Sequence, residues 1–202
     1  RLSAMLPVNV RGMWIGTFHG LCNRFLRAHW KLANLPQTFQ ILDTQDQLSA
    51  LKRLYKQFGI DDERFPPKQT QWFINDCKEE GPRPHAVEAR DADTRRKVEI
   101  YEHYEAQCQR EGVVDFAELM LRSYELLRDN DPVREHYQRR FRHLLIDEFQ
   151  DTNRLQYAWI KMIALEEAQG ALAAAYEDAE PAHEIISLAD RQRAERVVFY
   201  RS

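Results

Sequence analysis

Apolar residues along the chain form two kinds of pattern, short continuous runs and a helical period, which divide the sequence into three parts. Two short apolar runs, at residues 13–18 and 144–146, are typical of β-strands, and the second is typical of a strand buried on both faces. Between them, from about residue 44 to 137, apolar residues recur every three or four positions, which predicts helices. We therefore expect an α/β fold in which part of a parallel sheet carries both runs and a mainly helical insertion separates them.

Glycine and proline mark the ends of the predicted helices in this middle part. Leu51, Tyr55 and Phe58 share one predicted apolar face, and Gly59 is a natural terminator of that helix. A later helix is expected to end near Gly112. Residues 82–92 contain two prolines, mixed charge and few apolar positions, which together predict an exposed linker.

Composition excludes several classes of protein. The chain is 44% hydrophobic and 30% charged with a formal net charge of −3, so it should be globular without an overall basic signature for nucleic acid. Residues 122–142 hold six arginines and four acids, a mixture more typical of a solvated face than of a patch for duplex DNA. Cys22, Cys77 and Cys108 are far apart, which favours reduced thiols over disulfides or a metal site. No apolar run approaches the ~18 residues of a membrane span.

The strongest chemical signal directly follows the second apolar run. Asp147 and Glu148 come first, and an amide and a third carboxylate follow within three positions. Open α/β sheets bind ligands at the carboxyl ends of their strands, where one carboxylate can hold Mg²⁺ on nucleotide phosphates while its neighbour activates the attacking water. The alternative is a polar helix cap at residues 151–153. Gln150 and Asp151 beside the carboxylate pair favour the functional interpretation.

A second candidate site follows the first apolar run, where a polar turn leads into a predicted helix. Phe18 could stack on a base, and Thr17 and His19 could bond phosphates or sugars of a nucleic acid. From the residues alone, a core position for Phe18 and a turn position for His19 are the simpler reading. This strand, turn and helix form a βα unit, so the turn is expected at the same sheet edge as Asp147.

These two motifs carry a resemblance to a known family. Residues 147–151 resemble the Walker B motif of superfamily-one DNA helicases of the UvrD/PcrA/Rep type, and residues 17–20 resemble a single-stranded DNA contact of that family. The spacer, including residues 34–36 and 39–43, is most similar to the UvrD branch. The resemblance covers residues 1–165 and is specific, because both motifs occur in the expected order with a similar insertion between them.

A third motif, within the insertion, allows two interpretations. Residues 115–119 resemble a family motif associated with the DNA track, which implies that Asp115 and Phe116 contact DNA. Asp115 and Glu118 also fit a helix N-cap with an acidic first turn. The two readings are compatible.

The resemblance implies a partial RecA-like P-loop motor domain with a parallel sheet and a large, mostly α-helical insertion. The expected division is part of the first motor domain in 1–40, the insertion subdomain in 41–140, the Walker B strand and helix in 141–165, and an atypical tail in 166–202. The tail lacks the family's next motifs, and its end resembles a strand of the second motor domain. This indicates a deletion or gap near residue 165, or a genuine connector.

The resemblance also implies roles for the residues of the Walker B region. Asp147 would hold Mg²⁺ and Glu148 would activate the water. Gln150 would sense the γ-phosphate or couple it to the DNA site, and Asp151 would brace the loop. The parent protein would use ATP to move 3′ to 5′ along single-stranded DNA and to open duplex at a junction. It would act in excision and mismatch repair with DNA-repair proteins, in the bacterial cytoplasm at the nucleoid and not at a membrane.

One expected motif is missing from the 202 residues. They contain no Gly-x-x-x-x-Gly-Lys-Ser/Thr loop, which would cradle a triphosphate. We therefore expect that these residues alone do not hydrolyse ATP at a useful rate. A non-catalytic module, in which the helical insertion binds DNA or a protein partner, is the main alternative. A helical scaffold in which Asp147 and Glu148 only cap a helix is the other.

Overall fold

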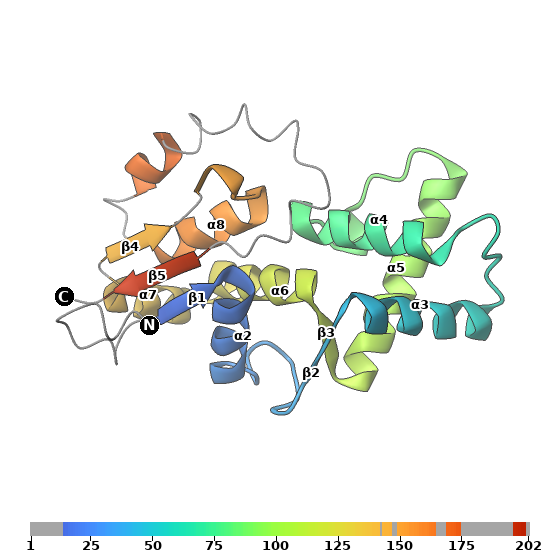
Figure 1. Cartoon of the computed structure of the whole chain (residues 1–202), viewed down its shortest axis with the longest axis horizontal. Helices are drawn as coiled ribbons and strands as arrows, with labels where there is room; N and C mark the ends of the chain where they lie inside the picture. The colour runs from blue at the N-terminus through green and yellow to red at the C-terminus, as the bar shows by residue number, and fades with distance from the viewer. Residues whose placement is uncertain (1–13, 142, 147–148, 165–168, 175–195, 201–202) are drawn as a thin grey trace. The chain divides into compact units, whose positions relative to one another are not determined.

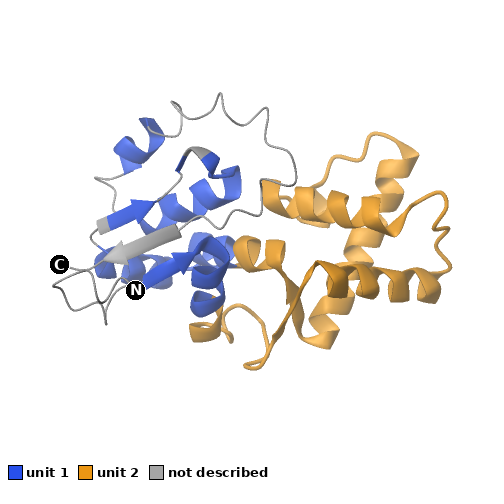
Figure 2. Ribbon diagram, in the orientation of Figure 1, with its two compact units in different colours: residues 1–25, 123–202 blue, residues 26–122 orange. Residues whose placement is uncertain are grey.

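The computed structural model of the chain describes residues 14–141, 143–146, 149–164, 169–174 and 196–200 (Figure 1). The chain divides into two compact units (Figure 2). We call residues 1–25 and 123–202 the sheet unit and residues 26–122 the helical unit. The finer division predicted from the sequence stays a prediction.

The sheet unit is built around a three-stranded sheet. Its strands are β1 (Trp14–Thr17), β4 (His143–Ile146) and β5 (Arg196–Tyr200). Its helical elements include the start of α2 (Phe18–Ala28), the end of α6 (Phe116–Asp129), α7 (Asp131–Arg140), the 3-10 helix η3 (Phe149–Asp151) and α8 (Arg154–Ile163). The strand order is β1-β5-β4, and β5 runs antiparallel to both neighbours (Figure 1).

The prediction of a parallel sheet is wrong for these pairings. β1 and β4 point in the same direction, but β5 lies between them and forms the hydrogen bonds with each. Burial on both faces of β4 is also wrong, because Leu145 is 69% exposed. A run of three apolar residues does not reveal which face of a strand is covered. Among the described residues, parallel pairing is confined to a two-stranded sheet in the helical unit.

Buried aromatic rings fill the core of the sheet unit. Trp14 of β1 meets Tyr137 of α7 with ring centroids 5.4 Å apart and Phe141 at 5.3 Å, both edge to face. Phe25 of α2 also meets Tyr137 edge to face, with ring centroids 5.1 Å apart. Edge-to-face pairs of this kind add to the stabilisation from burial. Trp14, the first described residue of the chain, therefore packs the predicted first strand against α7.

The helical unit is mostly α-helix, as the sequence predicts. Its elements are β2 (Gln40–Leu42), α3 (Thr44–Phe58), α4 (Pro67–Glu80), the 3-10 helix η2 (Pro84–Ala86), α5 (Ala92–Glu111), β3 (Val113–Asp115) and the start of α6. β2 and β3 pair in parallel, with Ile41 opposite Val114. This short pairing joins the entry of the unit to the segment that precedes α6.

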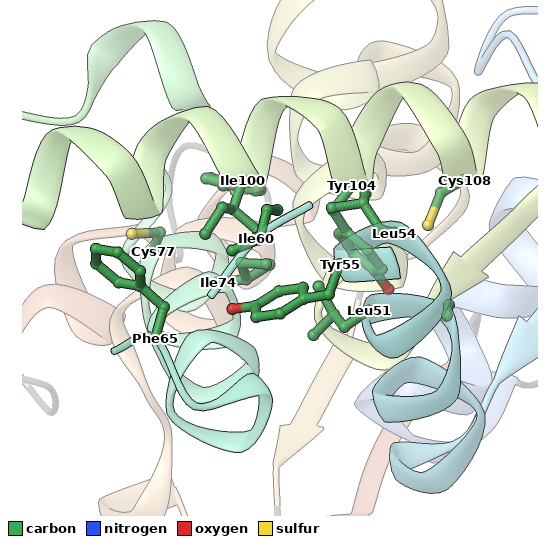
Figure 3. Packing of buried hydrophobic residues seen from close by; sticks show 12 residues of the cluster. Leu51, Leu54, Tyr55, Ile60, Phe65, Ile74, Cys77, Ile100, Tyr104 and Cys108 are labelled. Carbon is green, nitrogen blue, oxygen red and sulfur yellow. The ribbon is translucent and has the colours of Figure 1, made fainter. Parts of the chain in front are cut away.

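Helices α3, α4 and α5 enclose the core of the helical unit (Figure 3). The cluster consists of Ala50, Leu51, Leu54, Tyr55, Ile60, Phe65, Ile74, Cys77, Ile100, Tyr101, Tyr104 and Cys108. The Tyr55 hydroxyl lies 2.7 Å from Thr70 Oγ1, so its buried oxygen has a partner. Phe58 was predicted to share the apolar face of Leu51 and Tyr55, but it lies outside this core. It is 42% exposed and stacks on His103, with ring centroids 4.2 Å apart.

Glycine ends the helices at the predicted places. Gly59 follows α3 and Gly112 follows α5, with φ of 60° and 67°, conformations that residues with a Cβ adopt only with strain. The predicted exposed linker at 82–92 is only partly exposed. Pro84 is buried, and the guanidinium of Arg83 turns inward toward acidic side chains.

All three cysteines lie inside the protein. Cys22, Cys77 and Cys108 are buried, and none forms a disulfide. Burial raises the pKa of the Cys22 thiol to about 12 and that of Cys77 to about 11, so both are protonated near neutral pH. No helix in the described part of the chain is long and apolar enough to cross a membrane.

Candidate nucleotide and nucleic-acid sites

The two motif-bearing strands end at the same edge of the sheet. Thr17, the last residue of β1, is opposite Arg196 of β5, and Ile146, the last residue of β4, is opposite the adjacent Val197. The expected common edge is therefore confirmed for the strand ends, although β5 separates them. Asp147 and Glu148 follow Ile146 directly in the sequence but lie outside the described residues.

The turn after β1 is held by a hydrogen bond from its own backbone. Gly20 N donates to Thr17 Oγ1 at 3.2 Å, so the Thr17 side chain closes the first turn of α2. Phe18 is 1% exposed, and its ring lies edge-on to Trp159 of α8, with centroids 6.1 Å apart. In this arrangement the Phe18 ring is part of the core and cannot stack on a base. Its role as a DNA contact stays a prediction that requires the ring to move.

His19 lies beside Phe18 at the start of α2. Burial lowers the pKa of His19 below its usual value, so the imidazole is neutral at pH 7. A neutral imidazole can donate or accept a hydrogen bond but brings no positive charge to a phosphate. A DNA contact made by His19 would therefore be a hydrogen bond rather than an ion pair.

The segment after β4 identifies which residue caps the following helix. Asn153 Oδ1 accepts from Gln156 N at 2.9 Å, and Gln156 Oε1 accepts from Asn153 N at 2.9 Å, which is a complete capping box for α8. Asp151 lies in η3, is exposed and takes no part in this cap. The side chain of Gln150 lies outside the described residues. The cap alternative thus accounts for Asn153 and leaves Asp151 available for another role.

Asp115 and Phe116, the predicted DNA contacts of the third motif, lie in opposite environments. Asp115 is 2% exposed, and its Oδ1 accepts from Glu118 N at 2.7 Å, which confirms the predicted cap of α6. Its Oδ2 accepts from Lys78 Nζ at 2.7 Å and from the Tyr104 hydroxyl at 2.9 Å. Phe116, the next residue, is 45% exposed. Of the predicted DNA contacts in this motif, Phe116 is at the surface and Asp115 is inside.

Asp115 belongs to a buried ion cluster that the sequence did not predict. Glu118 accepts from Arg83 Nη1 and Nη2 at 2.9 and 3.0 Å and from Arg122 Nε at 2.7 Å, and Lys78 Nζ lies 3.1 Å from it. Arg83 also pairs with Glu105 of α5. The ion cluster, as we call it, consists of Lys78, Arg83, Glu105, Asp115, Glu118 and Arg122. Three cations face three anions, so the cluster carries no net charge.

Burial and charge act in opposite directions on these groups. Burial alone would raise the pKa of Glu118, but the charges of Lys78, Arg83 and Arg122 outweigh it and hold that pKa well below its usual range. Burial alone would lower the pKa of Lys78, but the carboxylates of Asp115 and Glu118 raise it instead. Both groups are therefore charged across the physiological pH range.

The arginines of residues 122–142 mostly pair with acids close in sequence. Arg128 pairs with Asp129, Arg134 with Asp131 and Arg139 with Glu135, at 2.6, 2.6 and 3.2 Å. Such pairs are typical of a solvated face, the interpretation that the composition favoured.

Nothing in the sequence indicated that Lys78, Arg83 and Glu105 belong to a buried cluster, since a charged residue in a helix or linker is normally exposed.

Comparison with known proteins confirms the resemblance found in the motifs. The model of the UvrD/REP helicase N-terminal domain family matches residues 1–175. The chain is 48% identical over 165 residues to DNA helicase II of Escherichia coli (strain K12), covering 81% of this chain and 23% of that protein. It is 52% identical over 154 residues to DNA helicase II of Haemophilus influenzae, covering 76% and 21%. It is 32% identical over 167 residues to the ATP-dependent DNA helicase PcrA of Leuconostoc citreum, covering 81% and 22%.

The chain thus spans less than a quarter of the length of these relatives. The matched region contains both motifs that carried the resemblance, at residues 17–20 and 147–151, and the further motif at residues 115–119. The chain belongs to the UvrD/REP helicase N-terminal domain family.

Proposed function

We propose that these 202 residues are part of an ATP-dependent DNA helicase that moves 3′ to 5′ along single-stranded DNA and acts in excision and mismatch repair. The observation that carries this proposal is the family match over residues 1–175, supported by relatives whose names are DNA helicase II and ATP-dependent DNA helicase PcrA. The sheet unit is then part of the first RecA-like motor domain. The protein would work on a single strand at a duplex junction, with DNA-repair proteins, in the cytoplasm at the nucleoid.

The nucleotide site would lie at the common edge of β1 and β4. Adjacent carboxylates after a strand suit Mg²⁺, which prefers oxygen ligands, and Asp147 would hold this ion while Glu148 activates water. Gln150 would sense the γ-phosphate or couple it to the DNA site, and Asp151, which takes no part in the cap of α8, would brace the loop. Bound Mg²⁺ and ATP would supply the phosphoryl chemistry. The phosphate-cradling loop that completes such a site does not occur in the 202 residues.

The DNA contacts would come from the turn after β1 and from the start of α6. Thr17 and His19 would bond the phosphate backbone, and the exposed ring of Phe116 would pack on a base or sugar. Phe18 and Asp115 would act from the interior, by supporting Thr17, His19 and Phe116.

Phosphate release by the 202-residue polypeptide tests the nucleotide half of this proposal. We expect no release above background with ATP, Mg²⁺ and oligothymidylate, and no difference between the original chain and the Glu148→Gln variant. DNA-stimulated release that Glu148→Gln abolishes would show that these residues form a working site by themselves.

A non-catalytic binding module remains the second candidate, and one observation favours it. The helical unit has its own hydrophobic core and its own balanced ion cluster, both built from residues 26–122. Binding of DNA that weakens with salt, ignores nucleotide and survives Glu148→Gln would identify this function. Binding that requires ATP would exclude it.

A further inference from the structure

Two members of the ion cluster flank Phe116, which is exposed, in the first turn of α6. The residue before Phe116 is Asp115 and the residue two places after it is Glu118, and both carboxylates are buried. Ala117, between Phe116 and Glu118, is 8% exposed. The exposed ring is therefore carried by a single helical turn whose neighbouring side chains on both sides are fixed inside the helical unit.

The two carboxylate oxygens of Asp115 bond to different elements around this turn. Oδ1 bonds the backbone of α6 at Glu118 N, while Oδ2 bonds Lys78 of α4 and Tyr104 of α5. Gln47 of α3 also reaches Oδ2, at 3.4 Å. The same carboxylate thus links the first turn of α6 to three other helices. Tyr104 belongs to the hydrophobic core that α3, α4 and α5 enclose (Figure 3).

Stability alone is a weak reason for such a cluster. Removing charges from water is costly, and a buried ion pair replaced by apolar residues of similar size often leaves a protein as stable or more so. The better attested use of buried charged groups is to select one arrangement of the surrounding elements. At the ion cluster, the element held by these charged groups is the first turn of α6, which bears Phe116.

We propose that Lys78 is a positioning residue for DNA binding: by holding Asp115 Oδ2, it fixes the first turn of α6 so that Phe116 is presented in one orientation. This inference rests on the proposed function, in which Phe116 touches the DNA strand. Lys78 is 1% exposed and does not itself reach DNA. Its effect on binding passes through its bond to Asp115, which caps α6, and its ion pair with Glu118 in the first turn of that helix.

A double substitution separates positioning from simple charge balance. Lys78→Met alone leaves the Asp115 carboxylate buried without its closest cation and should destabilise the helical unit strongly. Lys78→Met combined with Asp115→Asn leaves no charge at position 115, and the Asn oxygen can still cap α6. The Glu118 carboxylate keeps its bonds with Arg83 and Arg122 in this variant. We expect the double variant to recover most of the lost stability in urea. It still lacks the bond from α4, so the turn should remain mobile.

Fluorine NMR with 4-fluorophenylalanine at position 116 of the full chain reports this mobility without DNA. We expect one sharp resonance in the original chain and a broadened or split one in both Lys78 variants. Lys68→Met is the matched control, because it removes one lysine from the same helix at an exposed position, and it should leave the resonance sharp. A sharp single resonance in the double variant overturns the positioning role, since Lys78 would then only balance charge.

Binding of a labelled oligothymidylate of about 20 nucleotides tests the connection to DNA. Phe116→Ala should weaken binding about fivefold or more, and the double variant should weaken it by a similar factor. Adding Phe116→Ala to the double variant should cause less than about twofold further loss, because both act through the same ring. Independent, multiplying losses overturn the inference. An unchanged affinity for Phe116→Ala instead overturns the proposed contact, whatever the fluorine resonance shows.

Discussion

Gly59 and Gly112 form a matched pair whose different surroundings lead to a quantitative prediction. Both end a helix in the left-handed conformation, with φ of 60° and 67°, and both donate their N–H to a carbonyl of the last turn. A Cβ added at Gly59 meets nothing within 4 Å. A Cβ added at Gly112 would lie 2.8 Å from Pro36 Cγ, closer than carbon atoms approach without a shift. Substitution by alanine therefore has the same backbone cost at both positions, but a steric cost only at Gly112.

The shared cost is backbone strain. A residue with a Cβ in the left-handed region costs about 1 kcal/mol, partly offset by the lower entropy of the unfolded chain, and these effects are the same at both positions. Gly59→Ala should therefore lower the free energy of unfolding by about 1 kcal/mol or less. Gly112→Ala adds an overpacking cost of about 1–3 kcal/mol, because the Pro36 ring is rigid and must move as a whole.

Urea unfolding followed by circular dichroism, with both variants at the same pH and temperature, measures this difference. We expect Gly112→Ala to unfold at distinctly lower urea than Gly59→Ala. Pro36→Ala should bring the two variants closer together, since it removes the atom that the new methyl group meets. Equal destabilisation by the two glycine substitutions would refute the steric reasoning and leave only the backbone term.

Three further predictions concern the sheet unit. Burial lowers the pKa of His19, so the unfolded chain binds the proton more readily and stability should fall as pH drops below about 6.5; His19→Gln should flatten this part of the urea midpoint's pH profile. Phe18→Ala should cost about 3–5 kcal/mol by urea titration, because the ring is buried against Trp159, whereas a surface ring would cost far less. Asn153→Ala should cost about 1 kcal/mol in the same titration through loss of its bonds with Gln156, and an unchanged midpoint would contradict the capping box.

Local patterns predicted the parts of the fold that depend on neighbouring residues. The helical period identified the middle of the chain, and Gly59 and Gly112 ended helices where their position after the periodic residues indicated. Asp115 capped α6 as its spacing from Glu118 predicted. These features are decided within one or two helical turns, so the sequence contains the necessary information.

Features that depend on distant partners were not predictable in the same way. Leu145 was expected to be buried, but its exposure depends on what covers the sheet and not on its two apolar neighbours. The insertion of β5 between β1 and β4 joins segments far apart in the chain. Lys78 can be buried as a cation because Asp115, 37 residues later, and Glu118 supply counter-charges. A single sequence shows a lysine in a helix and gives no sign of that partner.

The burial of all three cysteines has a practical consequence for watching the chain move. A thiol reagent attacks the thiolate, so a buried, protonated cysteine reacts only when the structure around it opens. Cys22 lies in the sheet unit, and Cys77 and Cys108 lie in the helical unit. The modification rates of these native thiols, separated by peptide mass analysis, would therefore measure how often each unit opens in solution. Adding DNA to the same experiment would show which of the two units the DNA holds closed.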